Sequence, residues 1–336
     1  MRGPFPVLTR RTLLAAAAAS PALLSPPLLA RPGAMLTGAN LIEDPAAPFG
    51  SSKARESFRL LAEAGANMVA LIPFFWQAHG SDPNLVRGSA LPRDRLRRGV
   101  RDAVDAGLQV LVKPHVWVPE RWAGSVVFTD ESAWRQWLAA YEVALLECAE
   151  TAQETGAVAF SIGTELEQTS ARPEWIPLIE KVRRVFAGQL TYVAHNAAEA
   201  ERVGFWDRLD IVSISTYPPL GTATDRHGWR AAMERELGAL RRLADRHGKP
   251  AWLGEFGLRS ARGATRKPWE SAEERAAPAD PGLQRDVLQM WFDIARAHAI
   301  EAAFVWRWLS DPAGGGIQDT DFTIQNKPAQ DLLGMR

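Results

Sequence analysis

The sequence predicts a single α/β domain with the (β/α)8 (TIM) barrel fold, and three features of the 336-residue chain carry that prediction. From Met35 onward, strand-like and helix-like segments alternate, as in parallel sheets whose strands are joined by helices. Eight such units fill roughly 300 residues, a size typical of this barrel. A doubly wound open sheet is the alternative, but its usual glycine-rich turn is missing after the first strand, Met35–Leu41.

The first half of the chain supplies four strands, each a short apolar run, and three helices with amphipathic spacing. After Met35–Leu41 we expect, in order, helix Ser51–Ala64, strand Asn67–Trp76, helix Arg93–Ala106, strand Gln109–Val118, helix Ser132–Glu154 and strand Ala157–Gly163.

The second half repeats the rhythm. We expect, in order, helix Pro173–Phe186, strand Gln189–His195, a short helix Glu199–Trp206, strand Asp210–Tyr217, helix His227–His247, strand Pro250–Phe256, helix Gly282–Ala299, strand Glu301–Trp308 and a closing helix Lys327–Leu333. The charged, Pro/Ala-rich segment Arg262–Pro281 is predicted to be a long loop at the barrel mouth, which either closes the cleft or lies aside.

Residues 1–34 are predicted to be a signal peptide, and residues 35–336 the catalytic domain. Arg10 and Arg11 precede the apolar run Ala15–Ala19, and the pair resembles a twin-arginine export signal, which implies a periplasmic or secreted protein. The run is too short and too broken by proline to span a bilayer, and no lipid-attachment cysteine follows it, so we expect no membrane anchor after signal removal. A disordered basic tail is the alternative.

Composition narrows the range of partners. Lys plus Arg equals Asp plus Glu, 39 against 39, so no global basic field favours nucleic acid. The only cysteine, Cys148, lies in a predicted helix and forms no intramolecular disulfide. The six histidines show no metal-ligand spacing, so no metal or cofactor is predicted, and we expect a monomer.

Two buried strands each deliver a glutamate after a glycine. Gly163-Thr164-Glu165 ends the fourth strand, and Gly254-Glu255 lies at the end of the seventh. Active sites of these barrels lie where the strands end. Paired carboxylates there suit glycoside hydrolysis, in which one donates a proton to the leaving oxygen and the other attacks the anomeric carbon. We expect the short separation, about 5–5.5 Å, that accompanies retention of configuration.

The remaining strand ends carry aromatic, amide and imidazole side chains, without a cationic phosphate cradle. Such side chains suit a sugar, because tryptophan covers its apolar ring face while polar groups bind its hydroxyls. The predicted glycan-binding residues are Trp76, His115, Trp117, Thr164, Asn196, Tyr217 and Trp306, with Asn40 nearby. Glu167, two residues after Glu165, is the alternative acid.

The chain resembles clan A glycoside hydrolases and is most similar to glycoside hydrolase family 113, whose members include β-mannanases. The residues that carry the resemblance are Phe160–Leu166 (FSIGTEL), Trp252–Gly257 (WLGEFG) and Phe322–Ala329 (FTIQNKPA). By position, Glu165 is similar to the family's general acid/base and Glu255 to its nucleophile. Tyr217 resembles the tyrosine that hydrogen-bonds the nucleophile, and Trp306 the aromatic floor of the reacting subsite.

One residue departs from the clan's pattern. Many clan A enzymes place asparagine before the acid/base to bind the sugar 2-hydroxyl, whereas this chain has Thr164. Asn196 is a candidate replacement, and the choice between manno and gluco substrates stays open.

The resemblance implies an exported retaining β-glycosidase acting on a β-mannan or related β-1,4-glycan, an oligo- or polysaccharide. We expect ionised Glu255 to raise the pKa of Glu165 by like-charge repulsion, so that Glu165 is protonated when substrate binds. Two alternatives are a non-catalytic glycan-binding barrel and a clan A hydrolase or transglycosylase of other specificity.

Overall fold

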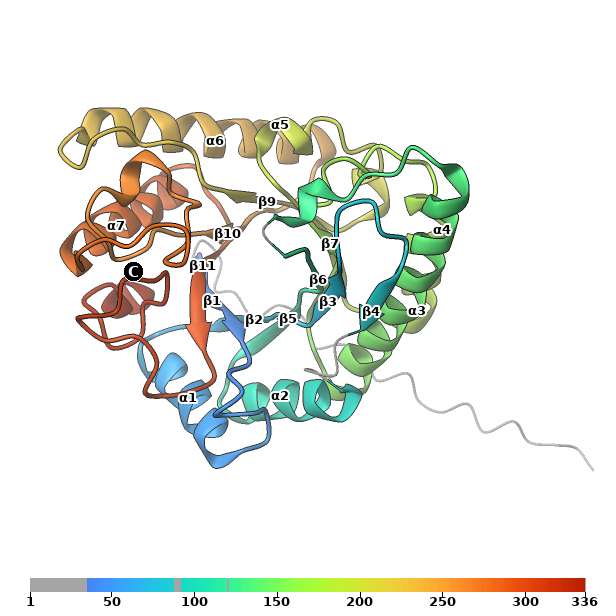
Figure 1. Cartoon of the computed structure of the whole chain (residues 1–336), viewed down its shortest axis with the longest axis horizontal. Coiled ribbons are helices and arrows are strands. Elements are labelled where there is room, and N and C mark those ends of the chain that lie inside the picture. The colour runs from blue at the N-terminus through green and yellow to red at the C-terminus, as the bar shows by residue number, and fades with distance from the viewer. Residues whose placement is uncertain (1–34, 88–91, 120, 336) are drawn as a thin grey trace, which may run out of the picture.

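Eight parallel strands close into a barrel, surrounded by helices (Figure 1). The computed structural model describes residues 35–87, 92–119 and 121–335, so the predicted signal peptide lies outside the described residues. Around the barrel the strands are β1 (Leu36–Ile42), β11 (Ala302–Leu309), β10 (Ala251–Phe256), β9 (Ile211–Thr216), β8 (Gln189–Ala194), β7 (Ala159–Thr164), β5 (Gln109–Val112) and β2 (Met68–Leu71). The predicted (β/α)8 barrel is confirmed.

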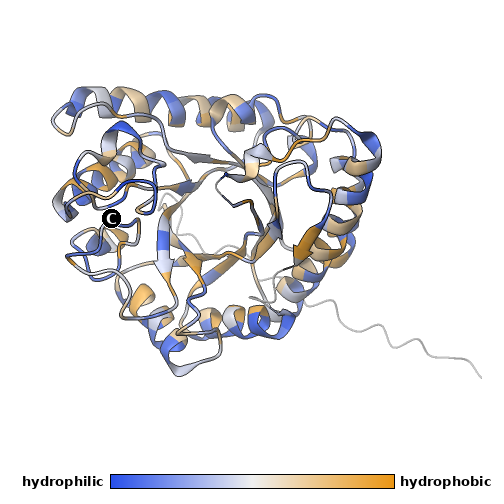
Figure 2. Cartoon of the chain, in the orientation of Figure 1, coloured by the Kyte–Doolittle hydropathy of each residue, from blue (hydrophilic) through white to orange (hydrophobic). Residues whose placement is uncertain are grey.

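The helices follow the strands they were predicted to follow. Along α2 and α6 the ribbon alternates between hydrophobic and hydrophilic residues, as expected of helices with one buried face (Figure 2). Asp130 caps the longest helix by accepting from two backbone N–H groups, and Gly156 ends it with φ 81°. The α-helices are α1 (Ser52–Glu63), α2 (Arg93–Asp105), α3 (Glu131–Thr155), α4 (Trp175–Val185), α5 (Ala197–Ala200), α6 (Arg226–His247) and α7 (Pro281–Ala297).

Two predicted strands are each divided by a proline. Asn67–Trp76 contains β2 and then β3 (Phe74–Gln77), and Gln109–Val118 contains β5 and then β6 (His115–Trp117). Pro73 and Pro114 have no N–H to donate to a strand ladder, so the regular barrel pairing stops at them. The prediction of one continuous strand in each segment is therefore wrong.

Beyond the prolines, the chain builds a second, smaller sheet. In it β3 pairs in parallel with β6 and antiparallel with β4 (Leu85–Arg87). The Trp76 and Trp117 backbones are direct partners in this sheet. The extension carries aromatic residues outward from the barrel end where the two predicted catalytic strands also finish.

Two predicted helices are shorter than expected. Glu199–Trp206 was expected to be one helix, but α5 ends at Ala200 and a separate 3-10 turn, η2 (Trp206–Arg208), follows Gly204. The closing helix Lys327–Leu333 is instead the 3-10 helix η4 (Gln330–Gly334), because Asn326 has φ 55° and Pro328 cannot donate a helical hydrogen bond.

The long loop after β10 is folded and anchored. Its ends meet at a β-bridge between Ala261 and Ala279, and it contains the 3-10 turn η3 (Ala264–Arg266). Arg259 is buried and donates to the Ser271, Arg275 and Thr320 carbonyls at 2.6, 2.8 and 3.0 Å. The loop is thereby tied to the segment that follows β11.

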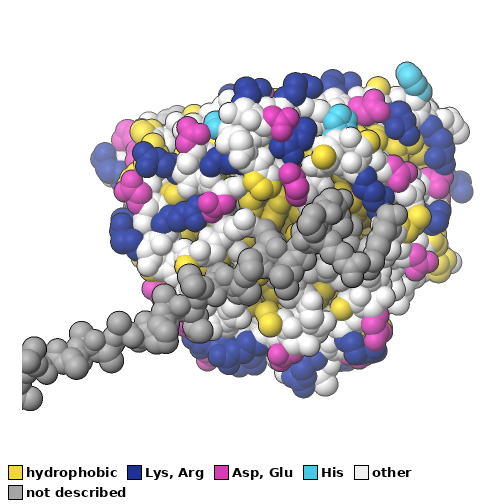
Figure 3. Space-filling view, turned by 180° about the vertical axis from the view of Figure 1, so that it is seen from behind, with side chains coloured by type: hydrophobic (Ala, Val, Ile, Leu, Met, Phe, Trp, Pro, Cys, Tyr) yellow, Lys and Arg dark blue, Asp and Glu magenta, His cyan; other side chains and the backbone are white. Residues whose placement is uncertain are grey.

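The outer surface mixes both signs of charge. Viewed from behind, Lys and Arg side chains alternate with Asp and Glu around the described part of that face (Figure 3). Across residues 35–87, 92–119 and 121–335, no helix has the length and apolar character needed to cross a membrane.

Candidate active site

The motif around Glu165 has a local physical explanation. At Gly163, a Cβ atom would come within 3.0 Å of the Tyr192 ring, so glycine leaves room for that ring beside β7. Glu165 follows with φ 55°, in the left-handed region that non-glycine residues rarely occupy. Its N–H donates to the Val193 carbonyl at 2.8 Å, which fixes the turn at the end of β7.

The Glu165 carboxylate lies between two imidazoles. His195 Nδ1 is 3.4 Å from Oε1, and His115 Nε2 is 3.8 Å from Oε2. Burial raises the pKa of Glu165, but the His195 hydrogen bond and the charges of both histidines outweigh burial and lower the pKa to about 2. Burial lowers the pKa of His195, but Glu165 outweighs it and the net pKa is raised.

This charge arrangement corrects one expectation. Like-charge repulsion from Glu255 was expected to raise the pKa of Glu165, whereas the net shift is downward because two histidines flank the carboxylate. In the protein without substrate, the carboxylate form of Glu165 and the imidazolium form of His195 therefore stabilise each other.

Glu255 has two side-chain donors. The ammonium of Lys113 contacts Oε2, and the Tyr217 hydroxyl donates to Oε1 at 2.9 Å. Lys113 is fully buried and also donates to Asn40 Oδ1 at 2.8 Å. Burial and the charge of Glu255 raise the pKa of Tyr217, so its hydroxyl stays protonated and donates. Both carboxylate oxygens of Glu255 therefore accept from side-chain donors.

The glycine before Glu255 is also explained by close packing. A Cβ at Gly254 would lie 2.5 Å from Ser213 Oγ on the neighbouring strand β9. The carbonyl of Gly254 accepts a hydrogen bond from Asn40 Nδ2 at 3.2 Å. Because all barrel strands are parallel, Glu255 on β10 and Glu165 after β7 lie at the same end of the barrel, with β8 and β9 between them.

An aromatic face leads away from Glu165 along the small sheet. The Trp76 and Trp117 rings have centroids 5.7 Å apart and are 37% and 41% exposed. Phe74 and His115 lie two residues earlier on the same strands, so the alternation of side chains places them on the same face as the two tryptophans. Their ring centroids are 5.9 Å apart. This face, with its two exposed tryptophans, is suited to sugar stacking.

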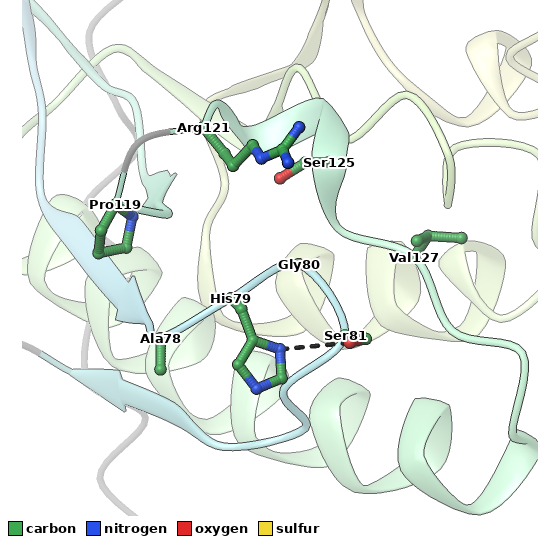
Figure 4. Close-up of a pocket in the computed structure, with 8 residues that line it drawn as sticks. All are labelled: Ala78, His79, Gly80, Ser81, Pro119, Arg121, Ser125 and Val127. Atoms are coloured by element: carbon green, nitrogen blue, oxygen red, sulfur yellow. Dashed lines mark hydrogen bonds between the residues drawn. The ribbon is translucent and has the colours of Figure 1, made fainter.

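A cavity of about 520 Å³ lies next to the residues that follow these strands (Figure 4). It lies between two loops, of which the first follows β3 and the second follows β6 and carries the 3-10 turn η1 (Ala123–Ser125). Neither predicted catalytic glutamate lines it. The lining residues are Ala78, His79, Gly80, Ser81, Pro119, Arg121, Ser125 and Val127.

The other predicted binding residues lie in different settings. Trp306 on β11 is half-buried, with the Lys113 ammonium 5.9 Å from its ring centroid, and so lies near Glu255. Thr164 is buried and its hydroxyl donates to the Pro114 carbonyl at 3.0 Å. Asn196 caps α5 by accepting from the Glu199 N–H at 2.8 Å. The sugar-binding roles of all three stay predictions.

Glu167 has a structural partner. Its carboxylate accepts from Arg202 at 2.6 Å, in an ion pair whose arginine is half exposed. Glu167 thus lies in a surface ion pair, whereas Glu165 faces the two histidines. This difference favours Glu165 as the acid/base.

Three residues around the glutamates were not among the predicted site residues. Lys113 contacts Glu255, His195 contacts Glu165, and the Trp122 ring lies 4.1 Å from the His195 ring, centroid to centroid. Lys113 carried a usable signal, because a lysine inside an apolar strand is rarely buried without a partner. Within the described residues, no cluster of three or more His, Cys, Asp or Glu could hold a metal ion.

Known proteins with the same architecture carry glycosidase activity. Residues 43–327 match the family described as Glycoside Hydrolase Family 113. A family 113 β-mannanase from Alicyclobacillus acidocaldarius, solved in complex with ManMIm, is 25% identical with a TM-score of 0.76, over 88% of this chain and 95% of that one.

Two further solved structures share the fold. A family 113 β-1,4-mannanase is 23% identical with a TM-score of 0.79, over 89% of this chain and 97% of the other. A family 5 mannosidase from Rhizomucor miehei is 12% identical with a TM-score of 0.64, over 88% and 91% of the two chains. No curated protein sequence matches the chain.

Proposed function

This chain belongs to glycoside hydrolase family 113, in clan A, and is a mannanase-like glycoside hydrolase; we propose that it cleaves β-1,4 bonds of a β-mannan with retention of configuration. The observation that carries the proposal is the contrast between the two glutamates. Glu255 is held by a lysine and a tyrosine, whereas Glu165 contacts the His195 imidazole, from which it can draw a proton. The site thus contains a nucleophile and a proton donor.

In the first step, Glu255 attacks the anomeric carbon and forms a glycosyl ester. The glycosidic oxygen takes a proton from Glu165, and the chain beyond that oxygen leaves as an alcohol. The proton comes from the Glu165–His195 pair, so His195 becomes neutral as Glu165 passes the proton on. Trp306, close to Lys113 and Glu255, forms the floor beneath the reacting sugar.

In the second step, water replaces the leaving alcohol. Glu165 accepts a proton from the water as the water's oxygen attacks the anomeric carbon, and the ester bond to Glu255 breaks. The proton returns to the Glu165–His195 pair. Lys113 and Tyr217 receive the Glu255 carboxylate again, with Tyr217 donating to the same oxygen as before.

The manno configuration is proposed from the two family 113 structures, which are a β-mannanase and a β-1,4-mannanase. Thr164 supports no direct contact with the sugar 2-hydroxyl, because it is buried and donates to Pro114. The C2 preference therefore rests on other residues near the reacting sugar, and mannan, glucomannan and xylan must be compared directly.

We also propose that the enzyme acts outside the cytoplasm. The support is the sequence of residues 1–34, in which Arg10 and Arg11 precede an alanine-rich run. Export would bring the enzyme to polymeric substrate that cannot enter the cell.

Three measurements test the catalytic proposal. Glu165→Ala and Glu255→Ala should each reduce kcat on a β-1,4-mannooligosaccharide at least a thousandfold, while a mechanism-based 2-fluoro-mannoside should label Glu255 in the wild type. The anomer first released, read by proton NMR, should be β. Release of the α-anomer would contradict retention, and full activity in both variants would contradict the assignment of the two glutamates.

A further inference from the structure

We propose that Glu199 is a positioning residue for the acid/base, acting through Tyr192 and His195. The inference rests on the proposed function, since it concerns how Glu165 is held for proton transfer. Glu199 is fully buried in α5, and its carboxylate accepts from Tyr192 and His195 rather than contacting the Glu165 side chain. Two short routes nevertheless join it to Glu165, and they reach opposite sides of that residue.

The first route fixes the backbone that follows Glu165. The Tyr192 hydroxyl donates to Glu199 Oε1 at 2.6 Å and accepts from the Leu166 N–H at 2.9 Å. Leu166 directly follows Glu165, whose φ of 55° needs support from its surroundings. Tyr192 thus anchors the chain one residue after the strained position.

The second route fixes the imidazole that contacts the carboxylate. Glu199 Oε2 accepts from the His195 backbone N–H at 2.5 Å, and the His195 ring contacts Glu165 Oε1 at 3.4 Å. The Trp122 ring lies on the other side of that imidazole, 4.1 Å away between centroids. Glu199 accepts from Tyr192 with one carboxylate oxygen and from His195 with the other. A substitution at Glu199 therefore weakens both routes at once.

The circuit is closed and largely buried. It runs from Glu165 to Leu166, Tyr192, Glu199 and His195, and back to Glu165. Burial raises the pKa of Tyr192, so its hydroxyl keeps the proton that it donates. A fixed imidazole and a fixed peptide together hold the Glu165 carboxylate in one orientation, and proton transfer to the glycosidic oxygen depends on that orientation.

The test compares substrates that differ in their need for an acid. Cleavage of a mannooligosaccharide needs full protonation of the leaving oxygen, whereas a dinitrophenyl β-mannoside releases a stable anion and needs little. A misplaced Glu165 therefore slows the first substrate selectively, whereas general disruption of the site slows both. For each substrate, kcat/KM reports the steps up to glycosyl transfer.

Glu199→Gln and Tyr192→Phe are the informative variants, since each keeps nearly the native volume. We expect kcat/KM on the oligosaccharide to fall at least tenfold and on the dinitrophenyl mannoside less than threefold. Glu236→Gln is the control, because Glu236 is a half-buried glutamate that also accepts a backbone N–H from α5, that of Ala197, and the Thr216 hydroxyl, but makes no hydrogen bond to Tyr192, His195 or Glu165 among the described residues. It should change neither value by more than twofold.

Equal losses on both substrates, or no loss on either, would overturn the inference. Thermal unfolding of each variant shows whether the protein is folded, and the second variant keeps the test open if the first fails to fold. A wild type that hydrolyses neither mannoside would instead count against the proposed function, so the two failures are distinguishable.

Discussion

At the residue scale, the contact between the Glu165 carboxylate and the His195 imidazole links catalysis to stability. The pKa of His195 is raised above 6.5, so its contribution to stability is full below pH 6.5 and is lost as the pH rises through the raised value. The pKa of Glu165 is lowered from 4.5 to about 2, so its contribution is present above pH 4.5 and is lost as the pH falls toward 2. The ion pair therefore stabilises the fold most between pH 4.5 and pH 6.5.

The first prediction follows from this pair. Glu165→Gln should lower the pKa of His195. Burial disfavours the imidazolium, and the substitution removes the Glu165 charge that stabilises it. The His195 imidazole resonances in an NMR pH titration measure this directly. Glu167→Gln is the control, since Glu167 acts on His195 by charge alone, and its effect should be smaller. An unchanged His195 titration in Glu165→Gln would contradict the assigned contact.

The second prediction concerns the lysine beside the nucleophile. Lys113→Met should destabilise the protein by about 3–5 kcal/mol, because it leaves the buried Glu255 charge without its cation. It should also reduce kcat at least tenfold. Denaturant unfolding and steady-state kinetics measure the two effects.

The matched control for this lysine is Lys181→Met. Lys181 pairs with Glu142 on the surface, with side chains 40% and 27% exposed, and its loss should cost less than about 1 kcal/mol. An equal loss of unfolding free energy in the two lysine variants would mean that the Lys113–Glu255 pair stabilises the protein no more than a surface pair does.

At the scale of elements, the sequence predicted which segments form strands better than where their pairing changes. The apolar runs Asn67–Trp76 and Gln109–Val118 have the composition of single strands, and only Pro73 and Pro114 reveal the division. Lys113, just before the second proline, follows β5 and its N–H still donates to the Leu71 carbonyl of β2, whereas His115, just after that proline, begins β6 of the small sheet. That switch explains how neighbouring residues reach different glutamates.

The sequence pattern could not predict contacts made through the backbone or between distant segments. The short helix α5 uses Asn196 as its cap and Glu199 as the acceptor for His195, so two polar residues that periodicity treats as surface positions instead support the site. Gly163 and Gly254 could be recognised as unusual from their place before the glutamates. Their reason, the closeness of Tyr192 and Ser213, appears only in three dimensions.

The third prediction tests the small sheet as a sugar-binding surface. Trp76→Ala and Trp117→Ala should each raise KM for a long mannooligosaccharide two- to tenfold, because one aromatic stacking contact contributes about 0.5–1.5 kcal/mol. The value of kcat should change less. Steady-state kinetics with oligosaccharides of increasing length measure the effect.

Trp269→Ala is the control for the tryptophan variants. Trp269 is 52% exposed in the loop after β10, outside the small sheet formed by β3, β4 and β6. If all three substitutions raised KM equally, the aromatic face of the small sheet would have no particular role in binding.

At the scale of the whole molecule, a closed barrel from β1 to β11 forms one hydrophobic framework that begins at Leu36. The strand–helix rhythm was sufficient to predict this closure, because each parallel strand requires a crossover and the chain offers eight in sequence. The framework begins just after the predicted signal peptide. The two parts of the chain should therefore be separable in function.

The fourth prediction makes that separation measurable. Replacing Arg10 and Arg11 together by lysine should stop export and leave precursor inside the cell, because the twin-arginine pair is read as an address and not as charge alone. Arg2→Lys, which makes the same chemical change outside the pair, should leave export intact. Cell fractionation with an antibody against the barrel measures where the protein accumulates.

A shortened chain tests the other half of this separation, the independence of the barrel. A chain of residues 35–336 should unfold at the same temperature and cleave mannooligosaccharide with the same kcat as the full chain, since every residue of the proposed mechanism lies within β1 to β11 or the loops between them. Unchanged export of the double lysine variant would exclude the twin-arginine route. Loss of kcat in the shortened chain would show that residues 1–34 contribute to the catalytic barrel and are not only a cleavable signal peptide.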